Sequence, residues 1–260
     1  MNSREDKLQA FGRLLDIMDD LRAKCPWDKK QTMDSLRHLT IEETYELCDA
    51  ILEGDMGEVK KELGDILLHM VFYAKIASEK NIFDIADVLN AICEKLIFRH
   101  PHIYGDVEVH DEEDVKRNWE KLKLKEKGEK TSVLEGVPTS LPALVKAVRM
   151  QDKVRGVGFD WSDKKDVWAK VKEELEEFEQ ELEQGNTDHM EAEYGDLLFS
   201  LVNYSRHVNI NPEDALERTN KKFRARFQAM EKLIHSDEKN LSEMTLAEMD
   251  IYWEKVKNKA

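Results

Sequence analysis

The sequence has few of the features that mark secreted or membrane-spanning proteins. Its three cysteines, Cys25, Cys48 and Cys93, are widely spaced and lack CxxC or histidine-ligand spacing, which argues against a disulfide framework or a zinc site. The longest apolar run, near residues 66–74, is far shorter than the roughly 18 residues needed to span a bilayer. The N-terminal MNSREDKL has no apolar signal core. We therefore expect a cytoplasmic protein without a membrane partner.

Glycine, proline and positive charge are also in short supply. The 260 residues include only 11 glycines and 5 prolines, and the formal net charge is −15. No GxxxxGK[ST] phosphate loop occurs, alternating strand patterns are scarce, and helical periodicity is nearly continuous. Because nucleic-acid binding needs a basic surface, this charge argues against a nucleic-acid partner. The composition predicts an all-α protein whose partner is a small ligand or a cation.

Several motifs of the first half return in the same order in the second half. They are EETYE and EELEE (42–46 and 173–177), ELGD and EYGD (62–65 and 193–196), KLIFR and KFRAR (95–99 and 222–226), and WEKLK and WEKVK (119–123 and 253–257). The first two pairs share one offset of 131 residues. We predict a tandem repeat of two helical-bundle domains, residues 1–125 and 143–260, joined by a charged linker with proline and glycine at 126–142.

Two of the repeated motifs place carboxylates on helices that a short turn connects. Glu62 and Asp65 lie in ELGDILLHMVFYA, where helical spacing puts both on one side and leaves no solvated face for them. Antiparallel hairpins around EGDMG and EQGNTD bring the acids of the preceding helix level with this pair and its repeat. Gly64 and Gly195, in mid-helix, suggest a close approach of another segment. The candidate metal ligands are Glu43, Glu46, Glu62 and Asp65 in the first copy, and Glu174, Glu177, Glu193 and Asp196 in the second.

Other interpretations of these acids remain open. Lys60 or Lys61 would serve as a partner for the buried pair, and the acids of the first helix would also suit a solvated face. In both copies, however, the acids of the two helices lie at the same height, which favours a bound cation. Close like charges repel and raise carboxylate pKa values unless a cation neutralises them. Ligands that are all oxygen select Mg²⁺, with Mn²⁺ as a substitute, and no Glu-x-x-His pair of a di-iron bundle occurs.

A Lys/Arg pair and a Trp/Lys pair follow each acidic hairpin. Both have ordinary structural interpretations, as a surface pair and as a ring that caps a small core. In so acidic a protein they also suit a clamp for phosphate oxygens and a ring that stacks on a base. The candidate nucleotide-binding residues are Lys95, Arg99, Trp119 and Lys123 in the first copy, and Lys222, Arg226, Trp253 and Lys257 in the second.

The tandem pattern EExxE then ExxD, together with CPWDKKQT and RHPHIYGD, closely resembles the MazG family of nucleoside triphosphate pyrophosphohydrolases over essentially the whole chain. The resemblance implies Mg²⁺-dependent hydrolysis of standard or aberrant NTPs and dNTPs to NMP and pyrophosphate, by a homodimer or higher homo-oligomer. Glu42 or Glu173, the remaining glutamate of each EE pair, is the candidate to orient or deprotonate the attacking water. His189 departs from the family, whose members often have a lysine there to contact phosphate.

Two other functions are compatible with the same residues. One is an acidic helical interaction protein whose carboxylates pair with lysines, and the other is a metal-dependent phosphohydrolase that releases orthophosphate. The second copy carries more fixed positive charge in NKKFRARF, residues 220–227, than the first copy does before HPH at 100–102. We therefore expect the C-terminal copy to be the more active one.

Overall fold

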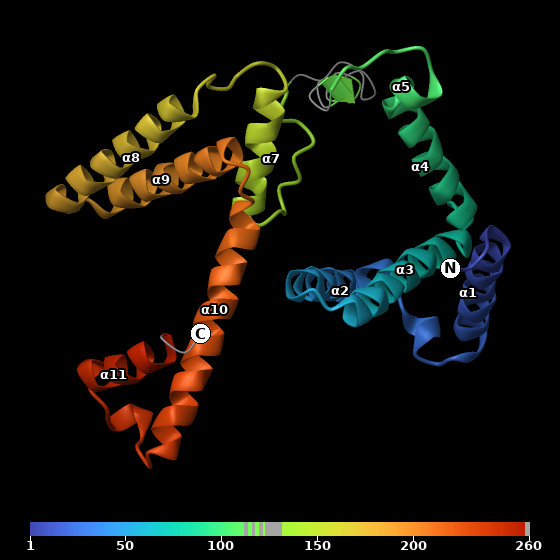
Figure 1. The fold of residues 1–260 in the computed structure, drawn as a ribbon. Helices are drawn as coiled ribbons and strands as arrows, with labels where there is room; N and C mark the ends of the chain where they lie inside the picture. The colour runs from blue at the N-terminus through green and yellow to red at the C-terminus, as the bar shows by residue number, and fades with distance from the viewer. Residues whose placement is uncertain (112–113, 116–117, 120–121, 123–131, 258–260) are drawn as a thin grey trace. The chain divides into compact units, whose positions relative to one another are not determined.

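The computed structural model describes residues 1–111, 114–115, 118–119, 122 and 132–257. Every regular element in these ranges is a helix and none is a strand, which confirms the predicted all-α fold (Figure 1). Contacts divide the chain into two units, Met1–Leu122 and Lys123–Ala260. Among the described residues, no helix has both the length and the apolar character that crossing a membrane requires.

The first unit is built around three helices that share one core. Its helices are α1 (Arg4–Lys24), η1 (Asp28–Lys30), α2 (Met33–Glu53), α3 (Met56–Ser78), α4 (Ile85–Arg99) and α5 (Pro101–Tyr104). Met18 of α1, Leu36 of α2 and Phe72 of α3 are almost fully buried against one another. Capping boxes that begin at Ser3 and Thr32 satisfy the first backbone N–H groups of α1 and α2.

The second unit repeats the hairpin of the first. Its helices are α7 (Ala143–Arg155), α8 (Lys164–Gln184), α9 (Thr187–His207), α10 (Pro212–Ser236), η2 (Leu241–Glu243) and α11 (Leu246–Lys257). Figure 1 shows α8 and α9 side by side, with α7 at one end of this hairpin. α10 leads away from the hairpin, and α11 folds back onto the C-terminal half of α10 around Met230, Ile234 and Tyr252.

The same turn chemistry closes both hairpins. Gly54 ends α2 with a φ of 72°, and Gly185 ends α8 with a φ of 74°, a left-handed conformation that favours glycine. Asp55 then caps α3 by accepting hydrogen bonds from the backbone N–H groups of Gly57 and Glu58. Asn186 caps α9 in the equivalent position. The expected antiparallel hairpins are therefore present with closely similar bounds in both copies.

Two expectations about the backbone have different outcomes. A Cβ atom added at Gly64 or Gly195 meets nothing within 4 Å, so the expected close approach at these glycines is wrong within this chain. Residues 126–131 of the expected linker lie outside the described residues. The segment that follows is attached to α7, because Lys153 Nζ donates to the carbonyls of Val133 and Glu135.

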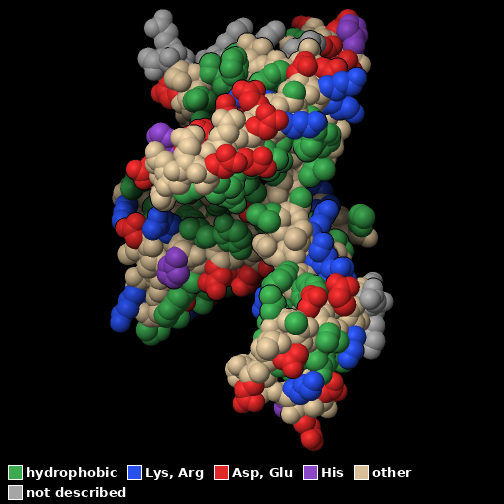
Figure 2. Space-filling view, turned by 90° about the vertical axis from the view of Figure 1, so that its left-hand side faces the viewer, with side chains coloured by type: hydrophobic (Ala, Val, Ile, Leu, Met, Phe, Trp, Pro, Cys, Tyr) green, Lys and Arg blue, Asp and Glu red, His purple; other side chains and the backbone are tan. Residues whose placement is uncertain are grey.

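Apolar side chains remain uncovered on several helices (Figure 2). Helix α4 has no buried residue at all, and its Val88, Ile92 and Leu96 are each more than 40% exposed. Because these residues are spaced four apart, they form one stripe along the helix. α4 therefore presents an apolar face that the other helices of the first unit do not cover.

Candidate functional site

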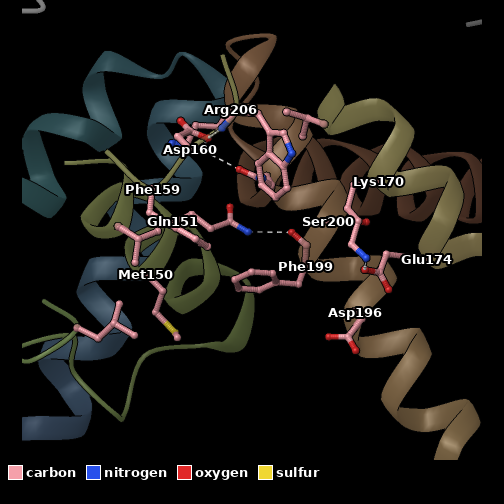
Figure 3. A pocket seen from close by; sticks show the side chains of 15 residues that line it. Met150, Gln151, Phe159, Asp160, Lys170, Glu174, Asp196, Phe199, Ser200 and Arg206 are labelled. Atoms are coloured by element: carbon pink, nitrogen blue, oxygen red, sulfur yellow. Dashed lines mark hydrogen bonds and ion pairs between the residues drawn. The ribbon is translucent and has the colours of Figure 1, made fainter. Parts of the chain in front are cut away.

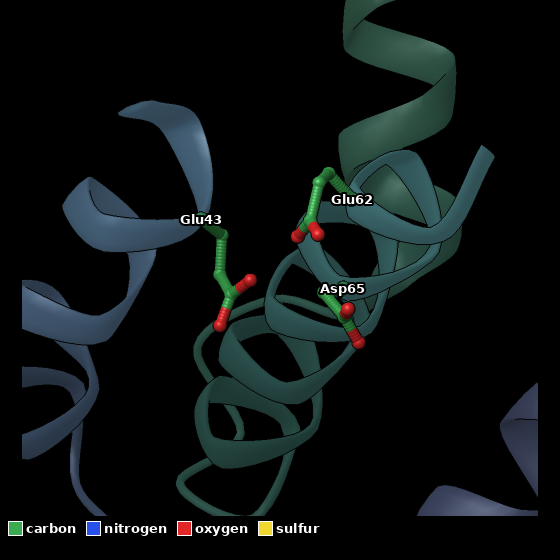
Figure 4. Close-up of side chains that lie close together, drawn as sticks. All are labelled: Glu43, Glu62 and Asp65. Atoms are coloured by element: carbon green, nitrogen blue, oxygen red, sulfur yellow. The ribbon is translucent and has the colours of Figure 1, made fainter. Parts of the chain in front are cut away.

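The α2–α3 hairpin brings three of the four predicted ligands of the first copy together. Carboxylate oxygens of Glu43, Glu62 and Asp65 lie within 4.8 Å of one another. Figure 4 shows Glu43 reaching from α2 toward the other two on α3. Glu62 is only 2% exposed, as its position in an apolar run predicted. Glu46, the fourth candidate, lies outside this group, although its charge is close enough to act on Glu43.

The α8–α9 hairpin forms the corresponding group in the second copy. Carboxylate oxygens of Glu174 and Glu177 on α8 and of Glu193 on α9 lie within 4.8 Å of one another. The fourth candidate, Asp196, is outside this triad and lines a cavity together with Glu174. Each hairpin thus gathers three carboxylates, of which two are at matching positions, Glu43 with Glu174 and Glu62 with Glu193. The third is the aspartate of ExxD in the first copy and the last glutamate of EExxE in the second.

The electrostatics of both groups favour a bound cation. Burial, together with the charges of Asp65 and Glu46, raises the pKa of Glu43. Burial and the charge of Glu174 likewise raise the pKa of Glu177. In the first copy, Glu62 Oε2 is buried and accepts no hydrogen bond. A buried carboxylate oxygen without a donor, facing other carboxylates, is chemically suited to a hard cation such as Mg²⁺.

A lysine contacts each carboxylate group but does not balance its charge. Lys61 Nζ lies 2.8 Å from Glu62 Oε1, so the alternative of a lysine partner is realised for this one oxygen. Lys170 Nζ lies 2.8 Å from both Glu174 and Glu173. Among the described residues, one lysine therefore faces three carboxylates in each group, which leaves an excess of negative charge.

The two candidate bases differ in their surroundings. Glu173 is exposed and held by Lys170, which places its carboxylate next to Glu174. Glu42 is exposed on α2, next in sequence to Glu43. His189, the departure from the family pattern, lies with its Nδ1 3.3 Å from Glu181 Oε2 on α8. Its ring thus faces a carboxylate in this chain.

A cavity of about 310 Å³ lies beside the second carboxylate group. Figure 3 shows Glu174, Lys170 and Asp196 at one side and Gln151 across from them. The remaining wall is mostly apolar and comes from α7, α8, α9 and the segment around Phe159. This cavity is not among the features predicted from the sequence. Its one visible signal is that Asp196, Ser200 and Asn203 recur at helical spacing in an otherwise apolar run.

A charged network closes the far end of this cavity. Asp160 Oδ1 accepts hydrogen bonds from Arg206 Nη2 at 2.9 Å and lies 3.1 Å from His207 Nε2. Arg206 Nη2 also donates to Asn203 Oδ1 at 2.6 Å. Burial alone would raise the pKa of Asp160, but the hydrogen bonds from Arg206 and His207 outweigh it and lower that pKa.

The predicted basic and aromatic residues lie close to one another rather than to the carboxylates. Trp253 packs 5.4 Å from the Phe223 ring on α10, the helix that carries Lys222 and Arg226. Lys257 pairs with Glu254 at 3.0 Å. No described contact joins these residues to the carboxylates of the α8–α9 hairpin, since α10 and α11 lead away from it (Figure 1).

The corresponding residues of the first copy are only partly described. The Arg99 guanidinium lies 5.8 Å from the centre of the Trp119 ring, a cation–π distance. Lys95 is exposed on the same helix, α4. Lys123, the last predicted residue of this set, lies outside the described residues.

Comparison with known proteins gives consistent matches. The MazG nucleotide pyrophosphohydrolase domain matches residues 31–104 and again 163–231. The nucleoside triphosphate pyrophosphohydrolase/pyrophosphatase MazG of Thermotoga maritima is 45% identical over 250 residues, which cover 95% of each chain. The nucleoside triphosphate pyrophosphohydrolase of Escherichia coli K12 is 40% identical over 96% of this chain and 98% of its own. A crystal structure of a MazG-related protein from Thermotoga maritima covers 43% of this chain and 97% of its own, at 25% identity and a TM-score of 0.39.

Proposed function

Because this chain belongs to the MazG nucleotide pyrophosphohydrolase family, we propose that it hydrolyses nucleoside triphosphates to nucleoside monophosphates and pyrophosphate. The observation that carries the proposal is the carboxylate group of the α8–α9 hairpin, whose Glu174 lines a cavity large enough for a small ligand. Standard and aberrant NTPs and dNTPs are all candidate substrates. The C-terminal copy is the proposed working site.

The metal of the proposed site is Mg²⁺, which Mn²⁺ can replace. Its ligands in the C-terminal copy are Glu174, Glu177, Glu193 and Asp196, and the equivalent set in the N-terminal copy is Glu43, Glu46, Glu62 and Asp65. When bound, Mg²⁺ neutralises phosphate charge and lowers the pKa of a bound water. An all-oxygen ligand set with raised glutamate pKa values supports this assignment.

The protein's own side chains contribute orientation and proton transfer. Glu173 is the proposed group that orients the attacking water and accepts its proton, because Lys170 holds it beside Glu174. The exposed position of Glu173 leaves room for that water. Glu42 has the equivalent place in the N-terminal copy. The site already carries an excess of negative charge, and a bound triphosphate adds more. Positively charged side chains other than Lys170 must therefore offset part of this charge.

A second copy of the chain is the proposed source of these cations. Lys222, Arg226, Trp253 and Lys257 are the proposed nucleotide-binding residues, yet they lie on the part of α10 and α11 that leads away from the carboxylates of the same chain (Figure 1). A homodimer that places α10 of one protomer beside the α8–α9 hairpin of its partner completes the site. The uncovered apolar stripe of α4 supports self-association, because such faces normally mark interfaces.

One experiment separates this function from its alternatives. The full-length protein is incubated with Mg²⁺ and a panel of NTPs and dNTPs, and pyrophosphate and orthophosphate are measured separately. We expect pyrophosphate in equal amounts with NMP, and loss of activity with EDTA that excess Mg²⁺ restores. Orthophosphate with NDP indicates a phosphohydrolase of different regiochemistry. Neither product indicates an acidic helical interaction protein.

A further inference from the structure

The cavity beside the C-terminal carboxylate group has the composition of a recognition pocket. Its volume of about 310 Å³ falls within the range of about 300–1,000 Å³ that is typical of small-molecule sites. Lys170, Glu174 and Asp196 line one side, whereas most of the rest is lined by apolar and aromatic side chains that include Phe159 and Phe199. A ligand whose phosphates lie at the carboxylates therefore has an apolar, partly aromatic space beside it.

Gln151 provides the first specific polar group of this pocket. The side chain is only 4% exposed, and its Nε2 donates to the Phe199 carbonyl at 2.8 Å, which fixes the amide. Its Oε1 is buried and accepts no hydrogen bond. An unsatisfied buried acceptor costs about 1–3 kcal/mol. Glutamine at this position therefore has a disadvantage that a hydrogen-bond donor on a ligand would remove.

Asn203 and Arg206 place donors on the same lining. Asn203 is 7% exposed, and its Oδ1 accepts from Arg206 Nη2 at 2.6 Å, so its NH₂ group is the part that can donate to a ligand. Arg206 Nε and Nη1 are buried and donate to no described acceptor. The lining thus offers an acceptor and several donors within an apolar space. The edge of a nucleobase, where N–H donors and O or N acceptors alternate on a flat ring, is complementary to it.

We propose that this cavity binds the nucleobase of the substrate, and that Gln151 and Asn203 determine which base it prefers. The inference rests on the proposed function, since the phosphates of the same molecule would lie at Glu174 and Asp196. The aromatic residues of the lining provide stacking surfaces that every base can use. Within one chain, the pocket is the aromatic surface next to the carboxylates, since Trp253 packs against Phe223 on α10.

The first copy closes the corresponding space. With the two ExxD motifs aligned, Ser200 and Asn203 correspond to His69 and Phe72. Phe72 is 3% exposed and packs in the core of the first unit with Met18. Large side chains therefore fill the place where the second copy has a small hydroxyl and an amide. The N-terminal copy thus retains the carboxylates but replaces the two small polar lining residues with a buried imidazole and a buried phenyl ring.

Two variants test the pocket with different risks to folding. Gln151→Met removes the free acceptor and retains the volume. Asn203→Asp retains the bond to Arg206 and replaces the NH₂ donor with a second acceptor oxygen, whose added charge faces the Arg206 guanidinium. Gln9→Met is the matched control. It makes the same glutamine-to-methionine change at an exposed position of α1, far from the cavity in sequence. Steady-state pyrophosphate release and equilibrium binding are measured for ATP, GTP, CTP and UTP. Inhibition by inorganic tripolyphosphate, which has no base, is measured in parallel.

We expect each pocket variant to raise KM at least 10-fold for some bases and to change the order of preference, with inhibition by tripolyphosphate unchanged. Gln9→Met should match the wild type. A folded variant, checked by circular dichroism, that keeps the wild-type order of preference overturns the proposal. So does an equal loss of NTP and tripolyphosphate affinity, which indicates a structural role. If the wild type binds NTPs selectively but releases no pyrophosphate, the proposed function fails while the base pocket stands.

Discussion

Replacing Glu43 with glutamine tests whether the first carboxylate group is held together at a cost in stability. Two unit charges 4.8 Å apart, the limiting separation in this group, repel by about 3.5 kcal/mol at an effective dielectric constant of about 20. Glu43 is half-buried, so solvent screens part of this repulsion, and Lys61 already offsets some of the charge. We therefore expect Glu43→Gln to stabilise the metal-free protein by about 1 kcal/mol, because the new amide can also donate to the buried oxygen of Glu62.

The measurement is thermal unfolding of the full-length protein at pH 7.5, with EDTA and with millimolar Mg²⁺ plus a nonhydrolysable nucleotide. In EDTA, the variant should unfold about 4 °C above the wild type in the transition of the first unit. With Mg²⁺, the wild type should gain stability by mass action and the variant should gain less. Glu94→Gln makes the same change at an exposed residue of α4 and should alter neither result.

The opposite pattern would refute the metal-site reasoning for this hairpin. A Glu43→Gln protein that is less stable without metal, and that gains as much from Mg²⁺ as the wild type, would show that the carboxylates pair structurally. That outcome would favour the interaction-protein alternative for the N-terminal copy.

Two further predictions concern pH and assembly. The lowered pKa of Asp160 contributes stability that is present above the carboxyl's ordinary pKa of 3.8 and is lost as pH falls through the folded value. Asp160→Asn should therefore cost about 2 kcal/mol at pH 7 and progressively less below pH 4, as measured by urea unfolding at each pH; an equal cost at both pH values would contradict this. The protein should also have a light-scattering mass of at least twice 30.4 kDa, and Ile92→Asp on the α4 stripe should lower it; a wild-type mass near 30.4 kDa at micromolar concentration would exclude the homodimer.

The hairpins and their carboxylates were predictable because they depend on local rules. A glycine in the left-handed conformation and a capping side chain define the turn between two helices. The helical period then determines which residues of the two helices face each other at the same height. Glu43, Glu62 and Asp65 therefore lie together as the spacing predicted. The third member differs between the copies, Asp65 in the first and Glu177 in the second, because side-chain conformation decides which of the level acids meet.

The cavity was not predictable because its residues come from separate elements. Gln151 bonds to the carbonyl of a residue 48 positions away, and Arg206 reaches Asp160 across 46 positions. Helical periodicity does not predict contacts between residues so far apart in sequence. They become visible only where α7 and the segment after it pack against α9. For Trp253, the sequence was compatible with a ring that stacks on a base and with a ring that caps a small core. In the structure its ring packs on Phe223.

The most direct test of a working C-terminal site compares two equivalent aspartates. Asp196→Asn and Asp65→Asn make the same change at matching positions of the two hairpins, and only Asp196 lines the cavity. Pyrophosphate release from NTPs with Mg²⁺ is measured for both variants, after circular dichroism has confirmed that both are folded. We predict that Asp196→Asn lowers turnover by orders of magnitude and that Asp65→Asn has a much smaller effect. If Asp65→Asn is the more damaging of two folded variants, the assignment of catalysis to the C-terminal copy is wrong.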